Sequence, residues 1–207
     1  RAFGAQVVLF TTSANKVADG LRLGAHAFCT KSAAGEEVLA AIARQKVELA
    51  RLRERETSDK ISQALVDSFN TPIEREDIEA LGSALYKIPK QVEKFADRYS
   101  LAIQHLEGID FAPRAAMLEQ AASVVVEMVH EIKKMNIDRM TSLNEKLRAI
   151  ENEADRLMLE LYRDIYSGRL DHLQMFLLKE FFEILEKAID RCREAGVVAY
   201  EIVLKNS

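Results

Sequence analysis

Hydrophobic positions recur with a helical period along most of the chain. From Glu36 to Phe69 the apolar side chains fall three and four residues apart, and a similar stripe runs from Asp171 to Leu204. This spacing places them on one face of a helix. Gly and Pro are scarce, whereas Ala, Leu, Glu, Lys and Arg are abundant, which favours helices over strands. The pattern therefore predicts an all-α chain.

We predict six helices from this periodicity and its start and stop signals. The first covers about residues 6–26, although Val7, Val8 and the Thr11–Thr12 pair would also suit a strand. Short connections between the helices favour an antiparallel bundle. The other five helices are predicted over residues 36–69, 71–105 with a bend at Pro89, 113–135, 142–166 and 171–204.

Two short stretches match the capping box that opens many helices. In Thr71–Glu74 a hydroxyl residue is followed by Pro72 and, three residues after the hydroxyl, by Glu. Ser142–Glu145 has the same spacing of Ser and Glu. Both are therefore expected to begin helices.

The composition excludes several classes of protein. The 8 Gly and 3 Pro in 207 residues are too few for a collagen-like or linker-rich chain. The two cysteines, Cys29 and Cys192, are expected to be reduced thiols in a cytoplasmic protein. A formal net charge of -4 gives no basic footprint for nucleic acid. We expect neither a membrane span nor a cleaved leader, because no apolar run approaches roughly 18 residues.

One seven-residue pattern recurs on three of the predicted helices. It reads apolar, Glu, two variable positions, apolar, Asp and Arg. A degraded copy surrounds Asp59, with Arg55 in place of the Glu. The intact copies are Val92–Arg98, Ile150–Arg156 and Leu185–Arg191.

These copies indicate an internal duplication. The aspartate spacings, 155 minus 59 and 190 minus 97, agree to within three residues. We therefore predict a single domain over residues 1–207, made of a first repeat at about 6–105 and a second at about 113–205.

The spacing of the acids has a chemical consequence. Glu at one position and Asp four residues later lie one above the other on a helix face, where like charges repel by roughly 0.2–0.5 kcal/mol. Two such helices side by side would gather four carboxylates, which calls for a compensating cation. Carboxylates alone suit Mg²⁺, Ca²⁺, Mn²⁺ or iron better than a closed zinc site. The candidate ligands are Glu151, Asp155, Glu186 and Asp190, with Glu93, Asp97 and Asp59 from the first repeat.

A solvated helix face is the alternative explanation of these acids. Charged residues four apart on helices commonly pair with Lys and Arg, and such partners follow the acids here. Only the second repeat has two intact copies, so a metal site is expected there first. The available basic partners are Lys94, Arg98, Lys187 and Arg191.

The run Thr71–Ile78, which follows Asp59–Ile61, resembles the PhoU-like phosphate transport regulators. It is more closely similar to their branch of accessory proteins that accompany Pit-type inorganic phosphate transporters. The resemblance extends over about residues 47–204, and Arg55 departs from it. The family's Glu/Asp-x-x-x-Asp motif is matched at Glu93 and Asp97, at Glu151 and Asp155, and at Glu186 and Asp190.

The resemblance implies a PhoU-like six-helix architecture of two three-helix bundle repeats with pseudo-twofold symmetry. It also implies carboxylate motifs that in some members hold iron or other metal clusters on the bundle surface. The function it implies is a non-enzymatic regulator that binds a membrane phosphate transporter or another regulator. Bound iron, Mg, Mn, Ca or Zn is expected, without a choice among them.

Three alternatives stay open at this point. The same acids could form the polynuclear site of a metal-dependent enzyme, or the chain could be a metal-free helical adaptor. Homodimerisation through surfaces left over after core packing is compatible with the pattern. Finally, Val7–Thr12, Gly24–Phe28 and Lys31 resemble the later part of a receiver domain, but we prefer the helical interpretation because the strands and acids which that fold needs upstream are absent from the sequence.

Overall fold

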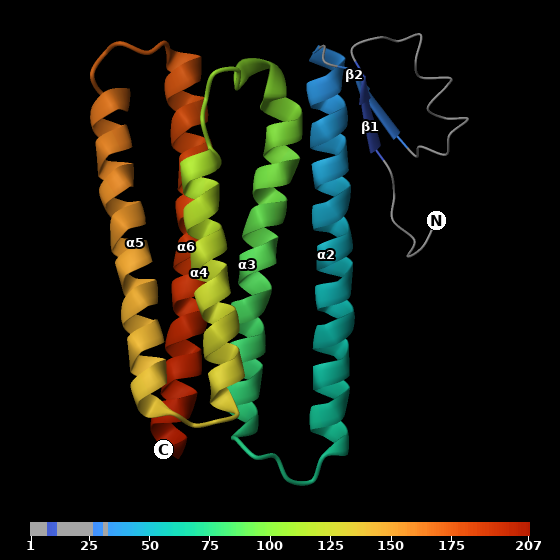
Figure 1. The fold of residues 1–207 in the computed structure, drawn as a ribbon, viewed down its shortest axis with the longest axis vertical. Coiled ribbons are helices and arrows are strands. Elements are labelled where there is room, and N and C mark those ends of the chain that lie inside the picture. Colours follow the sequence, from blue (N-terminus) through green and yellow to red (C-terminus); the bar gives the residue numbers. More distant parts are fainter. Residues whose placement is uncertain (1–7, 12–26, 31–32) are drawn as a thin grey trace.

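The computed structural model describes residues 8–11, 27–30 and 33–207, with side chains from residue 43 onward. The helices of the described part stand side by side with short connections (Figure 1). A 3₁₀ turn, η2, covers Ile103–His105. The α-helices are α2 (Ala33–Asp67), α3 (Arg75–Ala102), α4 (Ala112–Ile132), α5 (Ile137–Ile165) and α6 (His172–Asn206).

The prediction of an all-α bundle is confirmed for residues 33–207, but the first predicted helix is wrong where it can be judged. Strand β1 (Val8–Thr11) pairs in parallel with β2 (Ala27–Thr30), and Val8 is opposite Ala27. Valine and threonine favour the extended backbone, so local β-propensity prevails here. The rest of that helix, over 12–26, lies outside the described residues.

The two predicted capping boxes are also wrong. Helix α3 begins only at Arg75, and the Thr71 hydroxyl donates a 2.7 Å hydrogen bond to the Ile73 carbonyl. A hydroxyl that bonds to the adjacent backbone in this way forms a turn instead of a cap. Helix α5 begins five residues before Ser142, at Ile137, because the Asn136 side chain accepts a hydrogen bond from a first-turn N–H.

Helix α6 begins as predicted and is the central element of the bundle. The Asp171 side chain accepts a hydrogen bond from the Gln174 N–H, and the Gln174 side chain accepts one from the Asp171 N–H. The helix packs against α3, α4 and α5. Its fully buried positions are mostly small or medium-sized, which lets its neighbours approach closely: Phe181, Ala188, Ile189, Cys192, Ala195, Ala199, Ile202 and Val203.

An aromatic cluster joins α3 to the start of α4 and to α6. The rings of Phe95 and Phe181 meet edge to face at 5.4 Å, and Phe111 lies 5.4 Å from Phe95 in the same geometry. Leu106, in the turn after η2, packs into this cluster. These contacts connect the two sequence repeats, because α3 belongs to the first and α6 to the second.

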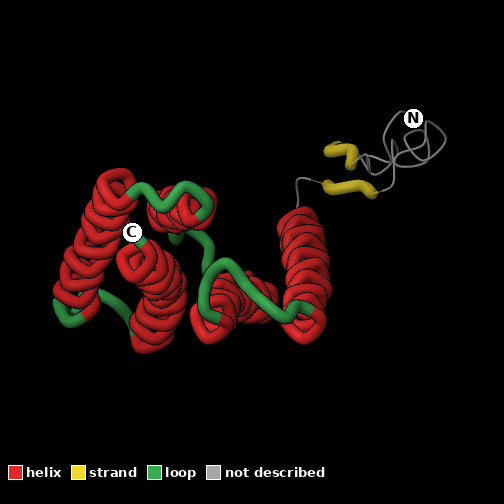
Figure 2. Tube along the Cα trace, turned by 90° about the horizontal axis from the view of Figure 1, so that it is seen from below, coloured by secondary structure: helices red, strands yellow, loops and turns green. Residues whose placement is uncertain are grey.

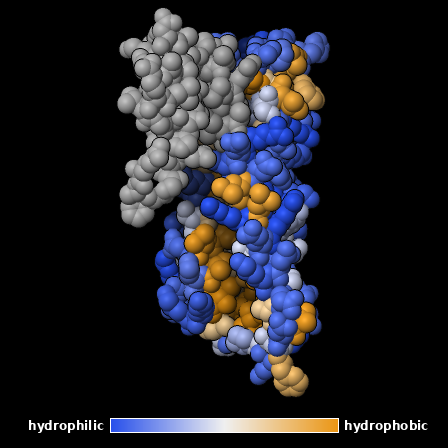
Figure 3. All heavy atoms as spheres, turned by 90° about the vertical axis from the view of Figure 1, so that its right-hand side faces the viewer, coloured by the Kyte–Doolittle hydropathy of each residue, from blue (hydrophilic) through white to orange (hydrophobic). Residues whose placement is uncertain are grey.

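Helices α2 and α3 lie at one side of the bundle and α4, α5 and α6 at the other (Figure 2). From residue 43 onward, Arg51 is the one fully buried residue of α2. Its apolar residues Leu49, Leu52, Ile61 and Val66 are all exposed. Apolar side chains consequently gather on this face of the molecule (Figure 3). Within the described residues, no helix combines the length and the hydropathy that crossing a membrane requires.

Two helical glycines allow a matched test of the packing around α6. A Cβ added at Gly196 would lie 2.3 Å from the Leu147 Cδ2 atom, whereas one added at Gly82 would meet nothing within 4 Å. We expect Gly196→Ala to lower the free energy of unfolding by roughly 1–2 kcal/mol through overpacking. Gly82→Ala should raise it by about 0.5–1 kcal/mol through helix propensity. Urea denaturation measures both, and a stabilised Gly196→Ala variant would contradict the close packing.

Candidate metal centre

Three carboxylates from α5 and α6 converge on one point. Asp155 extends from α5, and Glu186 and Asp190 extend from α6 one helical turn apart. One carboxylate oxygen of each residue lies within 4.8 Å of those of the other two. The neighbours Ala154 and Leu185 are buried, so each acid stands at the edge of the packed helix face. Three of the four acids that were predicted to meet in the second repeat therefore lie together.

Glu186 is the most strongly perturbed carboxyl of this group. Burial, and after it the negative charges of Asp190 and Asp155, together raise its pKa to about 7. Without a cation, the group therefore holds a proton up to neutral pH. A bound cation would take the place of that proton.

Basic side chains compensate only part of the negative charge of these carboxylates. Lys187 Nζ lies 3.3 Å from Asp190 Oδ2 on the same helix. Glu151, the fourth predicted ligand, lines one groove together with the three acids but lies 3.1 Å from the Arg193 guanidinium. Burial raises the pKa of Glu151, and Arg193 opposes that shift. We call Asp155, Glu186 and Asp190 the acid cluster, with Glu151 adjacent to it.

The acids predicted from the first repeat lie elsewhere, and two of them, Glu93 and Asp97, have basic partners. Glu93 is 3.1 Å from Arg51 Nε, and Asp97 is 3.2 Å from Arg44 Nε. Arg51 is only 3% exposed and stacks 4.5 Å above the Tyr86 ring. Asp59 is exposed on α2. Among the residues with described side chains, the acid cluster is the one place where three potential ligands come together.

The sequence analysis missed Arg44 and Arg51 as partners of these acids. A signal was present, because the two arginines are seven residues apart and so share a helix face. Under the duplication Arg51 also occupies the place of Leu147, a fully buried core residue. An arginine at a core position needs a carboxylate, and Glu93 provides it.

A groove lined by both basic and acidic side chains opens next to the acid cluster. Asp155 and Glu186 form part of its wall, together with residues of α3, α5 and α6. Arg98 of α3 pairs across it with Glu180 of α6, and the Tyr162 hydroxyl donates to Glu183 at 2.6 Å. Its basic side chains are Lys94, Arg98, Lys179 and Lys187. Its acidic side chains are equally numerous: Asp155, Glu180, Glu183 and Glu186.

The donor set fits a hard cation. All three groups are carboxylates, which are the ligands that Mg²⁺, Ca²⁺, Mn²⁺ and iron accept readily. Cys192 is buried in the core, where burial raises the pKa of its thiol to about 12, so it is no ligand. An ion here would have fewer protein ligands than hard cations require, which leaves positions for water or for oxygen atoms of an anion.

The raised pKa of Glu186 predicts an unusual pH dependence of stability in metal-free protein. The folded state binds one more proton than the unfolded state between about pH 4.5 and 7, so the free energy of unfolding falls as pH rises through this window. Glu186→Gln should remove that fall and gain about 1–2 kcal/mol at pH 8, allowing for partial solvent screening.

Urea denaturation with a chelator at pH 5 and pH 8 measures the effect. Glu107→Gln, at an exposed loop position, is the control, and its free energy of unfolding should depend on pH as that of the wild type does. An unchanged slope in Glu186→Gln would mean that this carboxyl is ordinarily solvated.

Comparison with known proteins identifies the fold. No protein-family model matches the chain. The UPF0111 protein YkaA of Bacillus subtilis (strain 168) is 23% identical over 145 residues, which cover 68% of each protein. A PhoU-like protein from Shewanella oneidensis MR-1 superposes with a TM-score of 0.73 at 18% identity, covering 83% of this chain and 86% of that one.

A second solved structure agrees with the first. A putative PhoU-like phosphate regulatory protein from the same organism has a TM-score of 0.69 at 18% identity, with the same coverage of both chains. The predicted PhoU-like fold class is thereby confirmed, with five helices in the described part where six were predicted. The chain has the helical fold of PhoU-like proteins.

Proposed function

We propose that the protein is a non-enzymatic regulator of phosphate transport whose acid cluster binds a metal cation. The observation that carries the proposal is the convergence of Asp155, Glu186 and Asp190 within 4.8 Å on a PhoU-like fold. The name of one structural neighbour, a putative PhoU-like phosphate regulatory protein, supports the regulatory role. The resemblance to accessory proteins of Pit-type transporters makes such a transporter, or a regulator attached to it, the partner that we propose.

Electrostatics favour a cation at this position. Two unit charges 4 Å apart interact by about 1 kcal/mol in water and about 4 kcal/mol at the effective dielectric of a protein surface. Because Glu186 is half-buried, its repulsion by a neighbouring carboxylate lies between these two energies. Lys187 offsets the charge of Asp190 alone. A divalent cation would relieve the repulsion within the whole cluster.

Occupancy of the cluster would change the charge of the surface that a partner meets. The neighbouring groove carries Lys94, Lys179 and Lys187. Because Glu180 and Glu183 also line this groove, its charges are balanced without the cation, and a bound cation would shift the surface toward positive charge, which favours phosphate or a carboxylate of a partner. This links metal binding to partner binding without any covalent chemistry. The proposed partner surface is the cytoplasmic face of the transporter.

Elemental analysis of protein purified without chelator tests the metal site. We expect the wild-type protein to retain a metal and the triple variant Asp155→Asn, Glu186→Gln, Asp190→Asn to lose it, because neutral amides are weaker ligands. The double variant Glu93→Gln, Asp97→Asn is the matched control and should keep its metal, because its acids already pair with arginines. Equal metal content in the wild-type protein and the triple variant would remove these residues as ligands.

Uptake of radiolabelled phosphate by cells tests the regulatory role separately. Deleting the gene should change the uptake rate at least about twofold, and the triple variant should behave like the deletion. Wild-type uptake in the deletion strain would refute the regulatory role and would leave the metal site standing. A purified protein that hydrolyses a model phosphoester only with added metal would instead favour an enzyme.

A further inference from the structure

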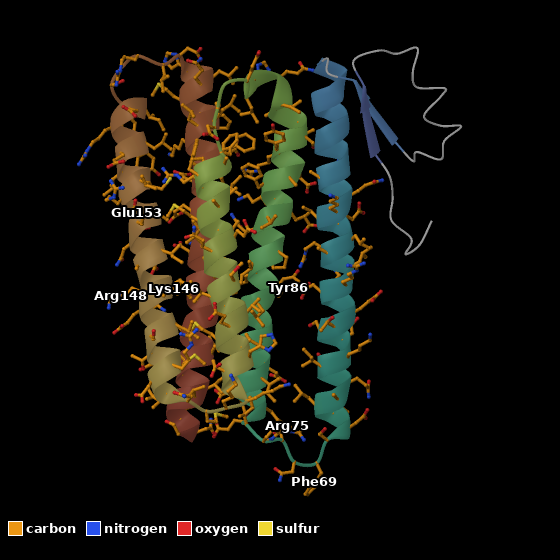
Figure 4. The ribbon with its side chains drawn as sticks, viewed as in Figure 1. Phe69, Arg75, Tyr86, Lys146, Arg148 and Glu153 are labelled. Carbon is orange, nitrogen blue, oxygen red and sulfur yellow. The ribbon has the colours of Figure 1, made fainter. Side chains whose placement is uncertain are left out.

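A groove lined only by polar side chains follows the middle of α3, and we call it the α3 groove. It has a volume of about 510 Å³, and Arg191 of α6 completes its wall. Tyr86 points from α3 toward α2 (Figure 4), and the Lys90 ammonium lies 5.6 Å from the centre of its ring. Each lining residue has a charged or amide side chain: Lys87, Lys90, Gln91, Glu93, Lys94, Asp97, Arg98 and Arg191.

Basic side chains outnumber acidic ones in the α3 groove, by five to two. Both acids have counter-charges on α2 that do not belong to the lining. Arg51 lies 3.1 Å from Glu93, and these acids therefore cancel little of the basic charge in the groove. Arg44 lies 3.2 Å from Asp97. The groove is thus locally positive, although the whole chain has a formal net charge of -4.

The basic residues of the groove have few carboxylate partners. Three of them pair with two carboxylates of α6, and the pairs are Lys87 and Arg191 with Glu194, and Arg98 with Glu180. Among the side chains that the structure describes, no carboxylate forms an ion pair with Lys90 or Lys94. The centre of the groove therefore has positive charge that an anion can neutralise.

The internal duplication distinguishes this row of charges from its counterpart. Under the spacing that relates Asp97 to Asp190, four basic residues of α3 each have a counterpart on α6. The corresponding residues are Lys87 and Glu180, Lys90 and Glu183, Lys94 and Lys187, and Arg98 and Arg191. Two of the four positions are thus basic in α3 but acidic in α6. The row on α3 is uniformly basic, whereas the row on α6 is half acidic.

The basic row is linear and long. Lys87, Lys90, Lys94 and Arg98 are three or four residues apart, which places them along one face of α3. From Lys87 to Arg98 the row extends about 16 Å, at a rise of about 1.5 Å per residue. A single phosphate group can contact only part of such a row. A chain of phosphate groups can follow it.

The polar lining narrows the class of anion. Protein partners bury apolar side chains at the centre of an interface, nucleotide bases stack on aromatic rings, and lipids need an apolar surface. No aromatic or aliphatic residue of the described part of the chain lines this groove. Lysine, the commonest residue of the row, binds phosphate as a compact point charge. The ligand that fits is a chain of phosphate groups without an organic part.

We propose that the α3 groove binds an inorganic oligophosphate. Lys90 and Lys94 contact the phosphate groups at the centre of the groove, and Lys87, Arg98 and Arg191 surround them. The affinity is electrostatic, so it falls as salt rises. The proposal does not require a metal in the acid cluster.

Isothermal titration calorimetry on the full chain, freed of metal beforehand, tests the class of ligand. Tripolyphosphate should bind at least about tenfold more tightly than monophosphate at low salt, because several phosphate groups contact the row at once. ATP contains three phosphate groups as well and should bind no more tightly, because no residue of the lining stacks on its base. An oligoglutamate peptide of the same charge should bind more weakly than tripolyphosphate.

Paired variants test the position of the site. Lys90→Gln with Lys94→Gln should reduce the affinity for tripolyphosphate at least about tenfold. The matched control, Lys146→Gln with Arg148→Gln, also removes two positive charges, from exposed positions of α5 (Figure 4), and should bind within about twofold of the wild type. Circular dichroism confirms that each variant is folded.

The triple variant of the acid cluster separates this proposal from the metal site. It should bind tripolyphosphate at least as tightly as the wild type does, because it removes negative charge near the α3 groove. Loss of metal binding without loss of tripolyphosphate binding would therefore be the expected result.

Four results would overturn the proposal. They are equal affinity for monophosphate and tripolyphosphate, no measurable binding of tripolyphosphate, and unchanged binding in a folded variant with Lys90→Gln and Lys94→Gln. The fourth is an equal loss of affinity in the α5 control, which would show a general effect of charge. Tighter binding of oligoglutamate or of ATP would instead assign the groove to an acidic protein segment or to a nucleotide.

Discussion

The packing of α5 against α6 brings three carboxylates within reach of one another, and the rest of the account depends on that contact. Small residues such as Ala195 and Ala199 let the neighbouring helices approach α6 closely, and the acids stand at the edge of the packed face. Burial of apolar side chains in the core outweighs their repulsion, which is roughly 1–4 kcal/mol for each pair of charges about 4 Å apart. The fold thereby maintains a charge arrangement that a cation would stabilise.

The two repeats use the same acid pattern in different ways. In the second repeat, the acid cluster has Lys187 as its close basic partner and borders an open groove. In the first repeat, Arg44 and Arg51 neutralise the corresponding acids of α3. The second half thus offers the site that we propose for an external cation, whereas in the first half side chains of the protein itself are the counter-charges. The exposed apolar residues of α2 complete this asymmetry, since they suit a partner surface.

Much of the fold could be predicted from the sequence because its signals are local and repeated. Long apolar periodicity located α6 almost to the residue, and in the structure the Asp171 side chain caps its start. Val8–Thr11 could not be assigned in this way, since a short β-branched run fits either a strand or a buried helix segment until its pairing is known. The starts of α3 and α5 were predicted wrongly, because Thr71 and Ser142 match the capping pattern. In the structure the two helices begin at other residues, Arg75 and Ile137.

The candidate site was predictable only in part for a similar reason. Helical spacing places Glu186 and Asp190 on one face, and the duplication points to α5 as the source of further acids. Which acids remain without close counter-charges depends on contacts between helices, such as Arg193 with Glu151 or Arg51 with Glu93. These contacts join residues far apart in the sequence and have no local signal.

Anomalous diffraction from crystals of protein purified without chelator tests the central claim most directly. Data collected on both sides of the absorption edge of the metal identified in the protein give an anomalous difference map that locates the ion. The account predicts a peak between α5 and α6, within about 2–2.6 Å of carboxylate oxygens of Asp155, Glu186 and Asp190. A map with its peaks elsewhere, or with none at an intact acid cluster, would contradict it.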